Sequence, residues 1–81
     1  MRVRVFVTLK PSVFDPQGKT IADALHSLGY GGVEDVRQGK YFEIELEAGA
    51  AREDAAQEMD QIARDVLSNP VMEDYRVEFI E

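Results

Sequence analysis

The chain has 81 residues, enough for one domain and too few for a second core, so we expect residues 1–81 to form a single domain. Hydrophobic residues make up 44% of the chain and charged residues 31%, which is typical of a globular domain and not of a disordered tail. The net charge of -7 argues against nucleic acid and acidic membranes as partners, because phosphate-rich surfaces attract clustered Lys and Arg.

The sequence also indicates a cellular location. Its first residues alternate between polar and apolar side chains instead of forming an apolar signal core. No apolar run approaches the roughly 20 residues needed to cross a bilayer. The chain has no cysteine and so needs no oxidising compartment. We therefore expect a cytoplasmic protein, and self-association would help so small a chain to bury more surface.

The first part of the chain predicts a strand and a helix. Apolar residues alternate with other residues over residues 2–9, the period of a half-buried strand. The helix begins either at Asp15, with Pro16 in its first position, or at Thr20. Gly29 favours a left-handed end of this helix.

The middle of the chain predicts a hairpin. Residues 33–38 are interpreted as a short, irregular edge strand, and residues 41–47 alternate cleanly between apolar and polar side chains. Gly39 and Lys40 stand between the two strands, where we expect a tight turn.

The last part predicts a second helix and a final strand. Residues 50–67 place an apolar stripe on one helix face, and Pro70 follows directly after the helix. The stripe consists of Ala55, Met59, Ile62, Ala63 and Val66. Residues 75–80 alternate again and predict the last strand.

The predicted order is β-α-β-β-α-β. Because crossover connections are right-handed, this order favours an α+β, ferredoxin-like fold with an antiparallel sheet and both helices on one face. The first strand then lies between the third and the fourth.

The helix-free face of this sheet carries both charges and apolar groups. Arg2 and Arg4 are expected to lie near Glu43, Glu45, Glu47 and Glu78. Such opposite-sign neighbours contribute roughly 0.2–1 kcal/mol each. Phe6, Tyr41 and Ile80 share that face. They are either scattered exposed residues or a docking surface for another subunit.

No residues stand out as a catalytic, cofactor-binding or metal-binding set. The only histidine, His26, has no partner close by in the sequence, and a lone helical histidine is more often structural. The carboxylates of residues 41–47 and of the second helix are spread out, whereas a hard cation needs converging oxygens. We therefore expect no catalytic residue, cofactor site or metal site on this chain.

Three loop segments carry polar residues that core packing does not require. They are residues 10–18, 37–40 and 69–76. Caps and turns account for their prolines and glycines but not for their polar neighbours.

These segments resemble the PurS family, the small subunit of multi-protein phosphoribosylformylglycinamidine synthase. The matching stretches are residues 9–13 (LKPSV), 15–18 (DPQG), 24–29 (ALHSLG), 36–40 (VRQGK) and 67–75 (LSNPVMEDY). The resemblance covers essentially the whole chain. Phe14 and the Gly31-Gly32 pair depart from the family pattern, and the acidic second helix is its variable part.

The resemblance implies a role in purine synthesis, in a carbon–nitrogen ligase that uses ATP and takes nitrogen from glutamine. A large synthetase subunit then binds ATP and magnesium, and a glutaminase subunit releases ammonia. The small subunit bridges the two without catalytic residues, helps ammonia to pass, and acts as a dimer or a dimer of dimers.

Motif match and loop position single out eight candidates for contact with these partners. They are Asp15, Gln17, Gly18, Arg37, Gly39, Lys40, Asn69 and Asp74. Each could instead serve only as a helix cap or part of a turn.

Two other functions remain open at this point. A ferredoxin-like dimer could sense a small ligand, for which Tyr30-Gly31-Gly32 is the one candidate loop. The chain could also be a small stand-alone hydrolase, but the loop after the first strand lacks the phosphate-binding arginine that acylphosphatases use.

Overall fold

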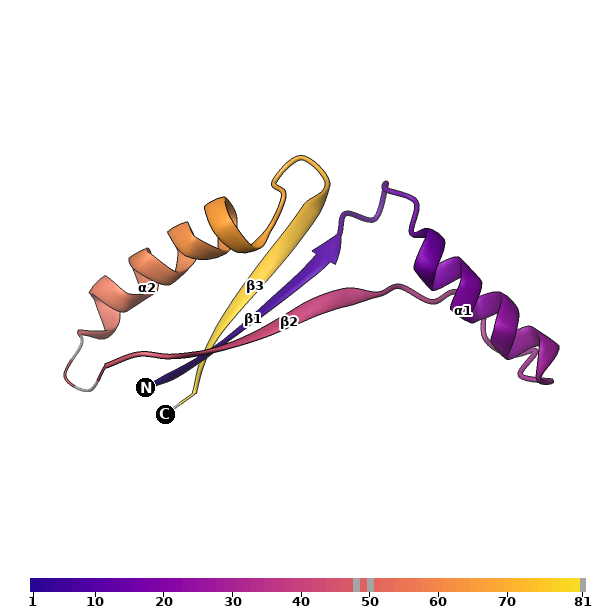
Figure 1. Cartoon of the computed structure of the whole chain (residues 1–81), viewed down its shortest axis with the longest axis horizontal. Coiled ribbons are helices and arrows are strands. Elements are labelled where there is room, and N and C mark those ends of the chain that lie inside the picture. The colour runs from indigo at the N-terminus through magenta and orange to yellow at the C-terminus, as the bar shows by residue number, and fades with distance from the viewer. Residues whose placement is uncertain (48, 50, 81) are drawn as a thin grey trace.

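The computed structural model describes residues 1–47, 49 and 51–80. In chain order, its elements are β1 (Arg2–Leu9), α1 (Pro16–Ser27), β2 (Gly39–Glu45), α2 (Arg52–Ile62), the π-helical turn η1 (Ala63–Leu67) and β3 (Glu73–Ile80). The strands form an antiparallel sheet in the order β2-β1-β3, as Figure 1 shows. The α+β class and the central place of the first strand are confirmed. Across the described residues, no helix has both the length and the apolar character to span a bilayer.

β1 forms the centre of the core. Val3, Val5 and Val7 alternate along it and are fully buried, as the period-2 pattern predicts. α2 packs on this face of the sheet through Met59, and η1 packs on it through Ala63; both residues are also fully buried. The predicted apolar stripe of the second helix is therefore confirmed at its centre.

The end of that stripe is different from the prediction. Val66 is 74% exposed, although the helical pattern places it in the core. The reason is the π-helical turn η1, in which the Ser68 N–H donates to the Ala63 carbonyl five residues earlier. This wider turn rotates Val66 away from the sheet, and Leu67 packs against the core in its place.

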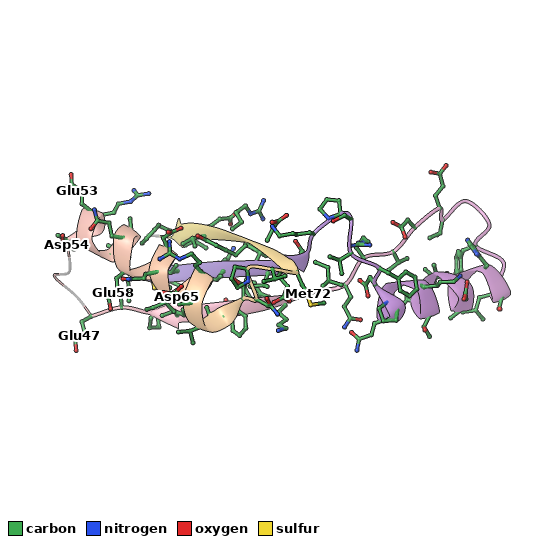
Figure 2. All side chains as sticks on the ribbon, turned by 90° about the horizontal axis from the view of Figure 1, so that it is seen from above. Glu47, Glu53, Asp54, Glu58, Asp65 and Met72 are labelled. Carbon is green, nitrogen blue, oxygen red and sulfur yellow. The ribbon has the colours of Figure 1, made fainter. Side chains whose placement is uncertain are left out.

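α1 has the predicted ends but not the predicted position. Asp15 is its N-cap with Pro16 in the first turn, and Gly29 adopts a φ of 99°, so both end signals are confirmed. However, α1 lies beyond the end of the sheet and not on its face (Figures 1 and 2). The prediction that both helices cover one face of the sheet is wrong for a single chain.

The molecule is correspondingly elongated. Its extents are 51 × 26 × 14 Å and its radius of gyration is 16.3 Å. A compact chain of this length would have a radius of gyration of about 12 Å. The extra length comes from α1 and the segment that follows it.

The predicted hairpin is also wrong. Residues 33–38 form no strand, and Gly39 and Lys40 begin β2 instead of making a turn. A side chain at Gly39 would place its Cβ 2.6 Å from the Val7 carbonyl oxygen, so glycine is required there by the close approach of β1. The described residues thus contain three of the four strands of a ferredoxin-like sheet.

The helix-free face of the sheet has the predicted charge pairing. Arg4 lies between Glu43 and Glu78 in the strand register, and Arg2 is 2.7 Å from Glu45. Phe6 and Tyr41 pack together with ring centroids 5.1 Å apart. Whether this face docks another subunit stays a prediction.

We predict that the core depends on Met59 far more than on Val66. Met59→Ala should lower the free energy of unfolding by about 2–5 kcal/mol, because it empties a fully buried site. Val66→Ala should change it by less than about 0.5 kcal/mol, since the π-helical turn exposes this residue. Urea denaturation at a fixed protein concentration measures both changes. If the two variants lost the same free energy of unfolding, the π-helical turn that exposes Val66 would be contradicted.

Candidate functional site

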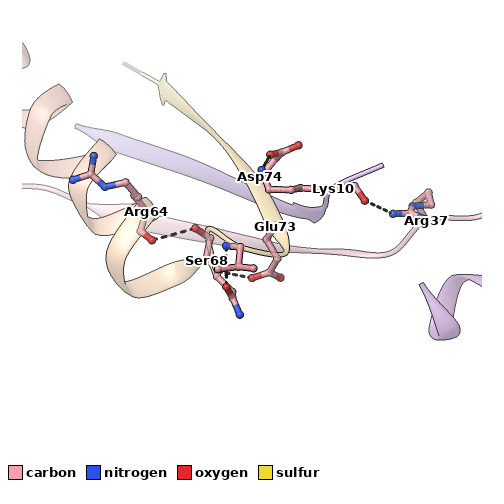
Figure 3. A network of polar contacts seen from close by, with 8 residues as sticks. Lys10, Arg37, Arg64, Ser68, Glu73 and Asp74 are labelled. Carbon is pink, nitrogen blue, oxygen red and sulfur yellow. Dashed lines mark hydrogen bonds and ion pairs between the residues drawn. The ribbon is translucent and has the colours of Figure 1, made fainter. Parts of the chain in front are cut away.

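The three loop segments predicted from the sequence meet at one end of the sheet. We call residues 10–18, 37–40 and 69–76 the loop end. β1 finishes there, while β2 and β3 begin there. The Lys10 N–H donates to the Met72 carbonyl over 2.8 Å, which joins the first segment to the third. Figure 3 shows the polar side chains around this junction.

Arg37 and Lys10 connect all three segments. The Arg37 guanidinium donates to the carbonyl oxygens of Lys10 and Val13, over 3.0 and 2.8 Å. The Lys10 ammonium lies 2.8 Å from the Asp74 carboxylate. The loop that follows β1 is therefore held from both sides, by residues 27 and 64 positions away in the sequence.

Glu73 organises the turn that precedes β3. Its carboxylate accepts from the Asn69 N–H over 2.7 Å and lies 3.8 Å from the Lys40 ammonium. The Asn69 side chain accepts from the Val71 N–H over 3.0 Å, the arrangement of an Asx turn. Asn69 thus shapes the loop, while Lys40 keeps an exposed ammonium beside it.

Asp15 holds α1 to the start of β2. Its buried carboxylate accepts from the Gly18 N–H over 2.9 Å and from the Gln38 N–H over 2.7 Å. These hydrogen bonds, first from Gln38 and then from Gly18, hold the pKa of the Asp15 carboxyl below its usual range. The carboxylate therefore caps the helix and also fixes its direction.

Gly18 allows the contact to be this close. A Cβ at Gly18 would lie 2.0 Å from the Val36 carbonyl oxygen, so no larger residue fits without moving the backbone. The side chains of Gln17 and Gln38 also hydrogen-bond to each other across the same gap. The N-terminal turn of α1 and residues 36–38 are therefore joined tightly.

All eight candidate residues lie at the loop end, but they do different things. Asp15, Gly18, Gly39 and Asn69 have the structural roles given above. The side chains of the other four are exposed: Gln17, Arg37, Lys40 and Asp74. The candidate set omits Lys10 and Glu73, which hold Asp74 and Lys40. The sequence places both within the predicted segments but gives no signal for their ion pairs.

The loop end contains charged and amide side chains but no histidine or cysteine. His26 lies near the other end of α1, where its Nε2 is 2.5 Å from the Val33 carbonyl oxygen. Among the described residues, no three His, Cys, Asp or Glu side chains are grouped closely enough to hold a metal ion. The loop Tyr30-Gly31-Gly32 is exposed and lies beyond the C-terminal end of α1, away from the loop end.

The acidic residues gather elsewhere. Figure 2 shows Glu53, Asp54 and Glu58 at the N-terminal part of α2, near Glu47. Met72, at the loop end, lies toward the other end of the sheet. The positive side chains of the loop end are thus separated from the most acidic part of the chain.

Comparison with known proteins identifies the family. The sequence profile of PurS, described as phosphoribosylformylglycinamidine (FGAM) synthase, matches residues 2–81. The chain belongs to the PurS family. It is a subunit of phosphoribosylformylglycinamidine synthase, a ligase of purine biosynthesis. The resemblance noted on the loop segments is thereby confirmed.

Individual relatives agree with this assignment. The chain is 44% identical over 80 residues to the PurS subunit of phosphoribosylformylglycinamidine synthase from Bacillus subtilis, covering 99% of this chain and 93% of the relative. It is 46% identical over 72 residues to the PurS subunit from Synechocystis, covering 89% and 71%.

Solved structures share its fold. The B. subtilis PurS structure superposes with a TM-score of 0.84 at 44% identity, covering 99% of this chain and 98% of that chain. A chain in the structure of PurLQS from Thermotoga maritima gives a TM-score of 0.84 at 31% identity, covering 95% and 93%.

The pKa of Asp15 predicts a pH dependence. Because its folded-state pKa is lowered, its charged form stabilises the fold above the unfolded-state pKa of about 3.9. This contribution is lost as the pH falls through the folded-state pKa. Asp15→Asn should therefore be less stable than the parent chain at neutral pH, and the difference should shrink below about pH 4. Urea midpoints across pH measure it.

Asp23 provides the matched control. It lies in the same helix, is exposed, and is 3.4 Å from Lys19. Asp23→Asn should leave the urea midpoint nearly unchanged, because exposed ion pairs contribute little. If Asp15→Asn were less stable than the parent chain by the same amount at every pH, the negative charge of Asp15 would not be responsible for its contact with Gln38.

Proposed function

We propose that the chain is the non-catalytic bridging subunit of the synthase. In this role it holds a large synthetase subunit and a glutaminase subunit in register and assists the transfer of ammonia between them. The loop end carries the proposal, because the segments that resemble the family form one polar surface held by their own hydrogen bonds. That surface offers charged and amide groups for contact with other subunits.

The chemistry of the complex gives this surface a purpose. The enzyme converts formylglycinamide ribonucleotide to formylglycinamidine ribonucleotide with ATP and with nitrogen from glutamine. In this proposal ATP and magnesium bind to the large subunit, no cofactor binds to this chain, and the complex is cytoplasmic. Ammonia reaches the synthetase site efficiently only if water is excluded along its route and the glutaminase and synthetase sites remain aligned. A single domain of residues 1–81 can supply that alignment through shape alone.

The exposed candidates are the proposed contacts with the other subunits. Gln17, Arg37, Lys40 and Asp74 present their side chains at the loop end. The structure of PurLQS from T. maritima contains a chain of the same fold, which supports an assembly of this kind.

Self-association is part of the proposal. We infer a dimer, or a dimer of dimers, as the working form. Phe14, Leu28 and Tyr30 are 66%, 74% and 59% exposed, so the α1 region presents three large apolar side chains that a second copy would cover. The elongated shape agrees with a chain that is completed by another copy.

We predict that the chain is needed for glutamine but not for ammonia. The assay mixes purified synthetase and glutaminase subunits with and without it, and measures synthesis from each nitrogen source. Glutamine-dependent synthesis should fall to background without the chain, while ammonia-driven synthesis should continue. Glutamine use that is independent of the chain would remove the proposal.

We also predict a contact role for Lys40. Lys40→Glu should weaken glutamine-dependent synthesis about tenfold at limiting concentrations of the chain, equivalent to about 1.4 kcal/mol of binding free energy. Excess variant should restore the rate, because the defect lies in assembly. Lys19→Glu makes the same charge change on the exposed side of α1, outside this set of contacts, and should behave like the parent chain. Identical behaviour of the two variants would exclude Lys40 from the interface.

A further inference from the structure

Two apolar side chains at the loop end have no role in the fold. Val71 and Met72 lie in the turn before β3 and are 80% and 44% exposed. Neither belongs to the core between α2 and the sheet. Single exposed apolar residues are normal, but these two are adjacent in the chain and follow the exposed Pro70. Residues 70–72 therefore present a short, continuous apolar surface, which we call the apolar turn.

The backbone of the apolar turn is held without help from these side chains. The Val71 N–H donates to the Asn69 side chain, and the Met72 N–H donates to the Asn69 carbonyl oxygen, each over 3.0 Å. The Met72 carbonyl accepts from the Lys10 N–H at the end of β1. A surface that is already ordered loses little conformational entropy when a partner covers it. The turn is thus suited to binding a partner, and its side chains can be replaced without changing its hydrogen bonds.

The apolar turn lies between polar contacts that are proposed above. Lys40 pairs with the buried Val7 in the strand register, so the Lys40 side chain is on the face that α2 covers. Asp74 pairs with the exposed Thr8, so the Asp74 side chain is on the helix-free face. The apolar turn is bound to the end of β1, the central strand. A partner that reaches both Lys40 and Asp74 around the loop end therefore crosses the apolar turn.

We propose that Val71 and Met72 form the apolar centre of the contact between the loop end and another subunit of the synthase. Protein interfaces have an apolar centre, in which Met is enriched, and a polar rim that excludes water from it. Lys40 and Asp74 supply the rim here. The partner presents an apolar hollow at this point, with a carboxylate beside Lys40. This inference rests on the proposed bridging function and adds which side chains give the contact its affinity.

The position of the turn favours a partner subunit over a second copy of this chain. The chain is a subunit of the synthase, so other subunits cover part of its surface. The proposed contacts with those subunits stand on both sides of the apolar turn. The apolar side chains that a second copy would cover include Leu28 and Tyr30, which lie at the far end of α1, away from the loop end.

Polar substitutions of matched shape test this inference. Val71→Thr and Met72→Gln keep the size of each side chain and change its polarity. The double variant should bind its partner at least about tenfold more weakly than the parent chain, because the contact would bury polar groups without hydrogen-bond partners. Fluorescence anisotropy measures binding to the purified synthetase, to the purified glutaminase and to both together. The label is placed on the N-terminus, at the opposite end of β1 from the loop end.

Val66 provides the matched control. It is 74% exposed, close to the value for Val71, but it stands alone on η1, outside the apolar turn. Val66→Thr should bind within about twofold of the parent chain, since isolated surface substitutions have small effects. Met72→Leu keeps an apolar side chain and should also bind like the parent. The urea midpoints of all these variants should match that of the parent chain, because the altered side chains lie outside the core.

Three results would overturn the inference. The first is a double variant that binds as tightly as the parent chain. The second is an equal loss of binding in Val66→Thr, which would show that the effect is not local to the turn. The third is a change in the sedimentation mass of the double variant alone, which would place the turn between copies of this chain.

The same binding measurements separate this inference from the bridging function. If the parent chain bound neither the synthetase nor the glutaminase, both proposals would fail together. If the parent chain bound and was required for glutamine use, but the double variant bound equally well, only the role of the apolar turn would be excluded.

Discussion

The passage of the chain through Gly39 determines the shape of the whole molecule. The Val7 carbonyl oxygen of β1 lies where a side chain at Gly39 would be, so the glycine permits a close strand contact. β2 therefore continues the direction of the preceding segment instead of reversing it. Residues 16–38 lie past the end of the sheet, so α1 does not cover the sheet of its own chain. The elongated shape follows from this one backbone path.

Local patterns in the sequence were sufficient for most of the elements. The alternation in residues 2–9 predicts the buried valines of β1, and Asp15 and Gly29 mark the ends of α1 correctly. Residues 33–38 show the limit of such patterns, because they form no strand although their sequence predicts a short one. Val66 shows a second limit, since a single π-helical turn changes which side chains face the core.

The sequence singles out the three segments that meet at the loop end, but it says less about what each residue does there. The three segments were found because core packing does not explain their polar residues. The second role of Asp15 depends on Gln38, which is 23 residues away, and the pairing of Lys10 with Asp74 spans 64 residues. No local pattern contains contacts of that range. The resemblance to a family finds matching stretches of sequence, but it does not separate residues that shape a loop from residues that contact a partner.

The contacts at the loop end differ in what they contribute. Exposed ion pairs such as Lys10–Asp74 add roughly 0–1 kcal/mol each to stability. The contacts that position the loops are of another kind: Arg37 donates to two backbone carbonyls, and the buried carboxylate of Asp15 accepts from two backbone N–H groups. Side chains that bind the backbone fix the course of the loop itself. A surface built in this way can keep its shape while its outer charges change, so partner binding and folding can be altered separately by substitution.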